Sequence, residues 1–150
     1  MLKTVLVGIL TLSGLGSLSA QSNQQIDVLL GQSPARLDSI AYLVLASAGL
    51  VPEDAEPSAA FDAAMAAGFV AGTKGAGDPV SIEELSYLVM KVLKVGGGWQ
   101  WSLFPNPRAA YQELAYKEFI NTTSGPGRIV AGDEVVRTLE AVLALKGGRN

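Results

Sequence analysis

Apolar residues recur at helical spacing along much of this chain. The clearest case follows Ser81, where the apolar side chains share one helical face: Leu85, Leu88, Val89, Val92 and Leu93. Glu84 stands three residues after Ser81, which is the signature of a capping box at a helix start. No stretch alternates apolar and polar residues as a half-buried strand does. The pattern therefore predicts an all-α fold.

Three further helices follow from the same spacing. The last one repeats the apolar face with Val135, Leu139, Val142 and Leu143. Shorter helices are predicted over residues 58–69 and 109–119. A glycine-rich loop follows each short helix, "AGTKGAGDP" and "NTTSGPGRI", and we expect these glycines to adopt positive φ and to end the helices.

The chain contains an internal repeat. Residues 59–95 align without a gap on residues 109–145, at an offset of 50 residues, and the aligned pairs include Phe69 with Phe119 and Glu84 with Glu134. Upstream, residues 34–44 match residues 79–89. We therefore expect one domain over residues 34–150, a small bundle of about five main helices. It would contain a half-repeat (34–49) and two repeats (59–95 and 109–145).

Residues 1–20 have the layout of a secretory signal peptide. Lys3 precedes an apolar run over residues 5–12, and small residues end at Ala20. We expect cleavage after Ala20, with cleavage after Ser19 as the alternative, and a lead-in over residues 21–33. Small residues interrupt the apolar run before it is long enough to span a membrane, so we expect no stable insertion after cleavage. The processed protein would be exported, to a bacterial periplasm or the cell surface.

Composition fits an exported globular domain. The 150 residues are 49% hydrophobic and 17% charged, and there is no cysteine, so the fold is predicted to rely on its core rather than on disulfides. The net charge of −3 becomes −4 in the processed chain, because Lys3 is lost with no acid. An acidic chain without a basic run gives no electrostatic reason to expect a nucleic-acid partner.

The repeat unit resembles an S-layer homology repeat. That family combines a short helix, a glycine loop and a second helix that opens with an Ile-Thr-Arg-x-Glu-like motif. Residues 80–84 (VSIEE) and 130–134 (VAGDE) occupy the motif here, and "FPNPRAAY" resembles the aromatic-led entry into the short helix. The resemblance implies a helical fold and a cell-envelope setting. The family's arginine, which takes part in recognition of an acidic cell-wall glycan, falls at Ile82 and Gly132.

Candidate catalytic chemistry is sparse. Without histidine or cysteine, the common general base, the thiolate nucleophile and the usual zinc ligands are missing. Glu83 with Glu84, or Asp133 with Glu134, offers two carboxylates, but neighbours on a helix point about 100° apart. We interpret them as acids that complement helix N-termini, and a carboxylate-only hydrolase as the weakest alternative. We expect no enzyme activity, no cofactor and no metal site.

The segment "GGGWQWSLFPNPR" holds both tryptophans of the chain. It is too rich in Gly and Pro to favour a helix, and in an extended segment Trp99 and Trp101 face the same side. The rings would then form a platform for a sugar face, extended by Phe104 and assisted by hydrogen bonds from Arg108. The alternative, which we favour, is that they pack as a plug between repeats, with one ring buried and one partly exposed.

These observations give two candidate functions. The first is a non-catalytic cell-envelope binding or structural module that contacts peptidoglycan or another glycan, with Lys74 and Arg128 from the twin loops as cationic helpers. The second is an exported scaffold that docks an envelope protein without binding glycan. The missing family arginine favours the second, and the tryptophan pair favours the first. The oligomeric state stays open.

Overall fold

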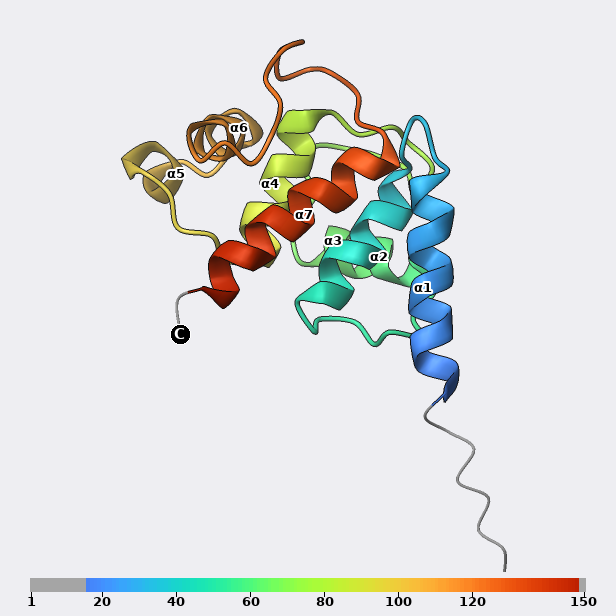
Figure 1. Cartoon of the computed structure of the whole chain (residues 1–150). Coiled ribbons are helices and arrows are strands. Elements are labelled where there is room, and N and C mark those ends of the chain that lie inside the picture. Colours follow the sequence, from blue (N-terminus) through green and yellow to red (C-terminus); the bar gives the residue numbers. More distant parts are fainter. Residues whose placement is uncertain (1–15, 149–150) are drawn as a thin grey trace, which may run out of the picture.

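The fold is all-α, as the apolar spacing predicts. A computed structural model describes residues 16–148 and contains seven helices in that range rather than the five expected (Figure 1). They are α1 (Gly16–Leu30), α2 (Leu37–Ser47), α3 (Pro57–Ala66), α4 (Ile82–Val92), α5 (Trp99–Leu103), α6 (Pro107–Tyr116) and α7 (Gly132–Gly147). No helix in this range is long and apolar enough to cross a membrane.

The starts of α2, α4 and α7 are joined by backbone hydrogen bonds. The Ala35 N–H donates to the Val130 carbonyl at 3.0 Å, and the Val130 N–H donates to the Val80 carbonyl at 3.0 Å. All three residues are buried and lie just before a helix. We call this cluster of Ala35, Val80 and Val130 the N-terminal junction. Because buried amides need partners, it fixes where the three helices begin.

The flanks of the junction repeat one pattern of contacts. The Leu37 N–H at the start of α2 donates to the Asp78 carbonyl at 3.0 Å, and the Ile82 N–H at the start of α4 donates to the Arg128 carbonyl at 2.8 Å. Asp78 and Arg128 are aligned positions, 50 residues apart. The loop that precedes α4 therefore caps the start of α2, and the loop that precedes α7 caps the start of α4. The internal repeat stays an interpretation of the sequence, and these contacts are consistent with it.

Helix α4 begins as predicted. The Glu84 N–H donates to Ser81 Oγ at 3.3 Å, and the Ser81 N–H donates to Glu84 Oε2 at 2.8 Å, so both halves of the capping box form. Its predicted apolar face is buried throughout, and α7 buries Val135, Leu139 and Val142 in the same core. Burial of this stripe is the main reason that α4 folds as a helix.

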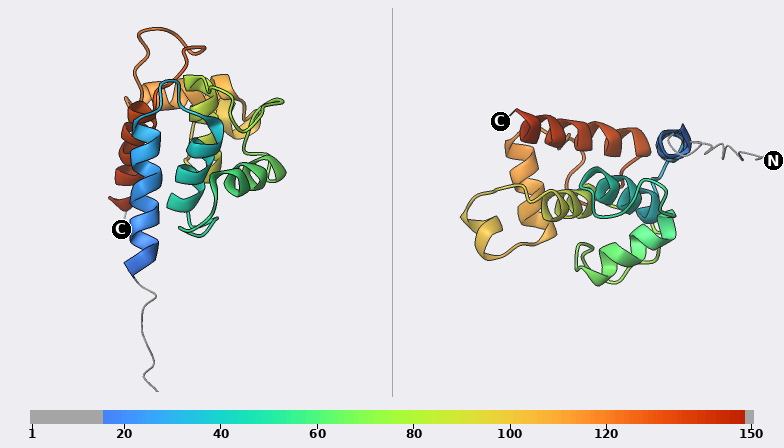
Figure 2. Two further views of the ribbon diagram at one scale, coloured as in Figure 1. Left: turned by 90° about the vertical axis from the view of Figure 1, so that its right-hand side faces the viewer. Right: turned by 90° about the horizontal axis from the view of Figure 1, so that it is seen from below.

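The helices pack in pairs around this core. Helix α3 packs on α2, α6 packs on α4, and α1 lies against both α7 and α2 (Figures 1 and 2). Helix α5 packs against α6, and the two lie at the opposite side of the molecule from α1 (Figure 2).

Helix α1 is not predicted by the sequence pattern, which gives residues 21–33 only as a lead-in. Most of the predicted signal peptide lies outside the described residues, and its last five residues open this helix. The predicted cut after Ala20 therefore falls inside α1.

The two short helices end earlier than predicted. They stop at Ala66 and Tyr116, and the chain then turns through left-handed conformations at Gly68 (φ 72°) and Glu118 (φ 60°). The expectation that the matched loop glycines need positive φ is only partly right. Positive φ occurs at Gly72 and Gly125, and not at the matched positions 75, 77 and 127.

Gly132 is required by the contact between α1 and α7. Its N–H donates to the Gln32 carbonyl at 2.9 Å, and a Cβ at this position would lie 1.7 Å from the Leu29 carbonyl oxygen. No side chain fits between the end of α1 and the start of α7. Position 132 is therefore glycine for a packing reason.

We predict that Gly132→Ala destabilises the protein by about 3 kcal/mol, because the Leu29 backbone must move to admit the methyl group. The matched control is Gly127→Ala, since a Cβ there meets nothing within 4 Å and φ is not positive. Urea unfolding followed by circular dichroism measures both. Equal stability of the two variants would contradict the close α1–α7 contact.

Candidate functional site

The residues Trp99–Leu103 are helical, so the expectation of an extended segment there is wrong. Trp99–Leu103 forms α5, and residues two apart on a helix point about 200° apart. Trp101 is 9% exposed and Trp99 is 69% exposed. The two rings therefore cannot form one platform, and the expected arrangement of one ring buried and one exposed is found.

Trp101 anchors α5 to the core. Its ring meets the Tyr87 ring of α4 edge to face, with centroids 6.0 Å apart and an interplanar angle of 80°. Gly97 allows this approach, since a Cβ there would lie 2.8 Å from Trp101 Cδ1. Trp101 therefore packs as a plug between α4 and α5.

A hydrogen bond to α6 fixes the start of α5. The Gly98 N–H donates to Glu113 Oε1 in α6 at 2.6 Å. Gly98 also carries no side chain that would block the carboxylate, because a Cβ there would lie 2.8 Å from the same oxygen. Gly97 and Gly98 therefore let α5 and α6 approach closely, whereas a Cβ at Gly96 would meet nothing within 4 Å.

The outer side of α5 is apolar and exposed. Trp99 and Leu103 are one helical turn apart, opposite Trp101, and Phe104 follows at the helix end. Their exposed fractions are 69%, 65% and 67%. Arg108 is exposed in the first turn of α6. Three of the four residues that were predicted around this segment are thus accessible to a ligand.

A groove lies between α5 and α6. Its volume is about 420 Å³, and it is lined by Gly96, Gly97, Gly98, Gln100, Gln112, Glu113, Tyr116 and Lys117. We call it the α5–α6 groove. Tyr116 is 86% exposed, and Lys117 lies 3.9 Å from the Glu113 carboxylate. The groove offers an aromatic ring, two amides and an ion pair.

The sequence prediction did not include Gln100, Gln112, Tyr116 or Lys117. One signal was present, because Gln112 and Tyr116 are four residues apart and must share a helix face away from the buried Leu114. Gln100 joins the groove only through α5, which the pattern does not predict.

The two cations from the loops are already engaged. Lys74 Nζ donates to Glu84 Oε2 and to the Pro79 carbonyl, both at 2.8 Å. Arg128 forms a two-pronged pair with Glu134, at 2.6 Å between Nη1 and Oε2. Each links a loop to the glutamate of the motif. Neither lines the α5–α6 groove, so the structure does not bring these predicted helpers to Trp99.

The Arg128–Glu134 pair stays charged in alkali. The hydrogen bond to Glu134 raises the pKa of Arg128 above its ordinary value, against an opposing effect of burial. Because the pKa of Arg128 is higher in the folded than in the unfolded protein, the pair stabilises the fold fully at any pH below the unfolded-state pKa. This stabilisation is lost only as the pH rises through the folded-state pKa. This contribution is therefore constant in the neutral and mildly alkaline range.

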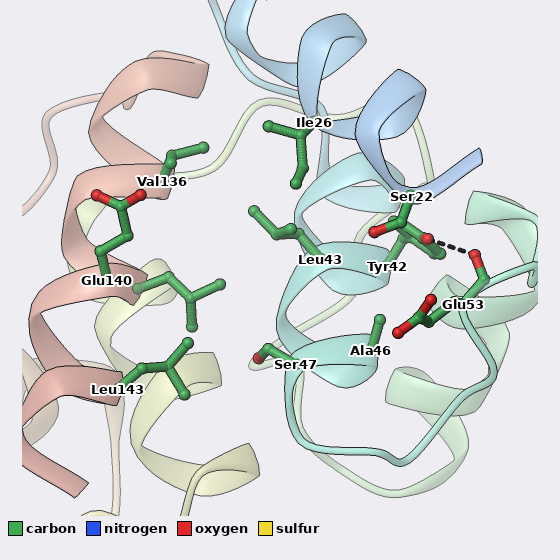
Figure 3. Close-up of a pocket in the computed structure, with 11 residues that line it drawn as sticks. Ser22, Ile26, Tyr42, Leu43, Ala46, Ser47, Glu53, Val136, Glu140 and Leu143 are labelled. Atoms are coloured by element: carbon green, nitrogen blue, oxygen red, sulfur yellow. Dashed lines mark hydrogen bonds between the residues drawn. The ribbon is translucent and has the colours of Figure 1, made fainter. Parts of the chain in front are cut away.

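A second, apolar pocket of about 270 Å³ lies between α1, α2 and α7 (Figure 3). Ile26, Leu43 and Leu143 come from three helices and line the space between them. The Tyr42 hydroxyl donates to the Glu53 carbonyl at 2.6 Å and so is already satisfied. The pocket offers no reactive group beyond exposed carboxylates, and we assign no chemistry to it.

Comparisons of this chain with protein-family models, with curated proteins and with solved structures found no match. The candidate site therefore depends on geometry and chemistry alone.

We predict that Trp101→Ala lowers the free energy of unfolding by about 3 to 5 kcal/mol, because it leaves a cavity beside Tyr87. The control, Trp99→Ala, removes the same side chain from an exposed position and should change stability by less than about 0.5 kcal/mol. Chemical unfolding of both variants checks this. A larger loss for Trp99→Ala would mean that the burial of the two rings is reversed.

We further predict that Arg128→Gln costs about 1 kcal/mol of stability, and that the loss is the same between about pH 7 and pH 10. The control is Arg137→Gln. Its pair with Asp133 is exposed, at 71% and 59% for the two side chains, so its loss should cost less than about 0.5 kcal/mol. Thermal unfolding across this pH range compares them, and a cost that disappears at the alkaline end would contradict the assignment.

Proposed function

We propose that the protein is a non-catalytic binding module of the bacterial cell envelope, and that it contacts peptidoglycan or another envelope glycan. One observation supports this most strongly. The exposed ring of Tyr116 lies in a groove with the amides of Gln100 and Gln112. Exposed aromatic rings beside amide groups are the combination that suits a sugar, which has an apolar face and a rim of hydroxyls.

The contacts divide into stacking and hydrogen bonding. Tyr116 would stack on the apolar face of one sugar, and Trp99, next to the glycines of the groove, would contact the neighbouring sugar. Each glutamine amide both donates to and accepts from hydroxyls. Phe104 and Arg108 extend the surface at the other end of α5. Trp101 holds α5 in place and makes no contact with the ligand.

Two features support a non-catalytic role in the envelope. The motif carboxylates Glu84 and Glu134 are held in ion pairs, so they serve the fold rather than a reaction. The signal-peptide layout of residues 1–20 supports export, which would bring the chain to the glycan.

A second candidate is an exported scaffold that docks an envelope protein. Leu103 supports it, because an aliphatic side chain that is 65% exposed between Trp99 and Phe104 suits a protein partner better than a sugar. The two candidates differ in the side chains on which they depend. Tyr116 and the glutamines serve the glycan, and Leu103 serves the protein.

The test is co-sedimentation of the exported, processed protein with purified cell-wall sacculi across a salt series. We predict that the wild-type protein pellets at moderate salt, and that Tyr116→Ala and Trp99→Ala each weaken binding by about tenfold, through loss of ring stacking. Leu103→Ala is the matched control, since it shortens an exposed side chain on the same helix and should bind as the wild type does.

Circular dichroism establishes that each variant is folded. If the wild-type protein stays in the supernatant at every salt concentration, glycan binding is wrong. If Leu103→Ala loses binding while Tyr116→Ala keeps it, the contact is with protein trapped in the sacculi, and the scaffold function replaces the glycan one.

A further inference from the structure

A lysine-lined groove lies at the end of the molecule opposite the N-terminal junction, where α2, α4 and α7 end. Its volume is about 780 Å³, within the range of small-molecule sites. We call it the C-terminal groove. Its floor is apolar and consists of Leu50, Phe69, Val92, Leu93 and Leu143. Leu50 is 54% exposed, so the floor is open to a ligand.

The rim of this groove is basic. Lys91, Lys94 and Lys146 line it, and no acidic residue does. Within residues 16–148, none of these three lysines forms an ion pair with a carboxylate. The overall charge of the chain is −3, so a rim of three cations without an acid is a local reversal of sign.

Each lysine is held at the rim in a different way. The Lys91 ammonium lies 5.7 Å from the centroid of the Tyr87 ring, and Lys146 donates to the Leu93 carbonyl. Lys94 is exposed and has φ of 53°, a left-handed conformation that is uncommon outside glycine. Lys91 and Lys146 are therefore held by contacts of their ammonium groups, and Lys94 by its backbone conformation.

Helix dipoles explain only part of this arrangement. Lys91 and Lys146 lie in the last turns of α4 and α7, where cations offset the partial negative charge of about half a unit at a helix end. Lys94 lies beyond the end of α4 and is not needed for that purpose. Three full positive charges also exceed the partial charges of three helix ends, so the rim remains positive.

The groove continues into a smaller hollow. Lys94 and Lys146 line this hollow of about 260 Å³ together with Val95, Leu145 and Lys117. Two more apolar side chains therefore extend the floor, whereas Lys117 is paired with Glu113 and also lines the α5–α6 groove.

We propose that the C-terminal groove binds a single-chain anionic amphiphile, with its hydrocarbon chain on the apolar floor and its phosphate or carboxylate among Lys91, Lys94 and Lys146. The charge of the rim selects an anion, and the apolar floor selects a chain over a free ion. No residue that lines the C-terminal groove lines the α5–α6 groove, so the proposal does not depend on the glycan contact.

The experiment is calorimetric titration of the processed protein with dodecyl phosphate, below the concentration at which it forms micelles. We expect saturable binding to one site. Dodecyltrimethylammonium has the same chain with the opposite charge, and inorganic phosphate has the headgroup without the chain. Both should bind at least about tenfold more weakly, because the first lacks the anionic headgroup and the second lacks the hydrocarbon chain.

Two variants locate the site. Lys91→Gln with Lys94→Asn should weaken binding of dodecyl phosphate by about tenfold, and asparagine is chosen because it tolerates the left-handed conformation of Lys94. The matched control, Arg36→Gln with Arg137→Gln, removes two surface cations elsewhere and should bind as the wild type does. Leu50→Glu places a carboxylate on the exposed floor and should also abolish the preference for the anion.

Wild-type affinity in the lysine double variant, once circular dichroism shows it folded, would overturn the proposal. Equal binding of the cationic detergent or of inorganic phosphate alone would overturn it as well. Unchanged binding by Leu50→Glu would place the ligand elsewhere, for example in the apolar pocket between α1, α2 and α7.

Discussion

The N-terminal junction is the constraint on which the rest of this structure depends. Hydrogen bonds from Ala35 to Val130 and from Val130 to Val80 bring together helix starts that are up to 95 residues apart in the sequence. Helices α2, α4 and α7 begin at this junction, and they pack against α3, α6 and α1 respectively. Gly132 adds the last contact, because only glycine admits α1 against α7 at this point.

The same framework positions both candidate sites. Helix α4 holds α6 on its outer side and Trp101 through Tyr87, so α5 is presented on a rigid support although it is only five residues long. The last turns of α2, α4 and α7 leave an apolar hollow with a basic rim. The motif glutamates, which are aligned in the sequence, are used for neither site and serve to tie loops to helices.

Local signals in the sequence predict the core helices well and the site poorly. The capping box at Ser81 and the apolar stripe of α4 involve residues within a few positions of one another, so they can be read directly. Helix α5 follows a glycine run and exists because of distant partners, Tyr87 and Glu113. Helix α1 is missed for a similar reason, since its contact with Gly132 joins residues a hundred positions apart and leaves no local pattern.

The central claim is that a sugar contacts the α5–α6 groove, and nuclear magnetic resonance titration with soluble peptidoglycan fragments tests it most directly. Amide and side-chain signals of Gly97, Gly98, Gln100 and Gln112 should shift together, with the indole N–H of Trp99 and without that of the buried Trp101. Shifts confined to the ends of α2, α4 and α7, or no shifts at saturating fragment, would contradict the claim.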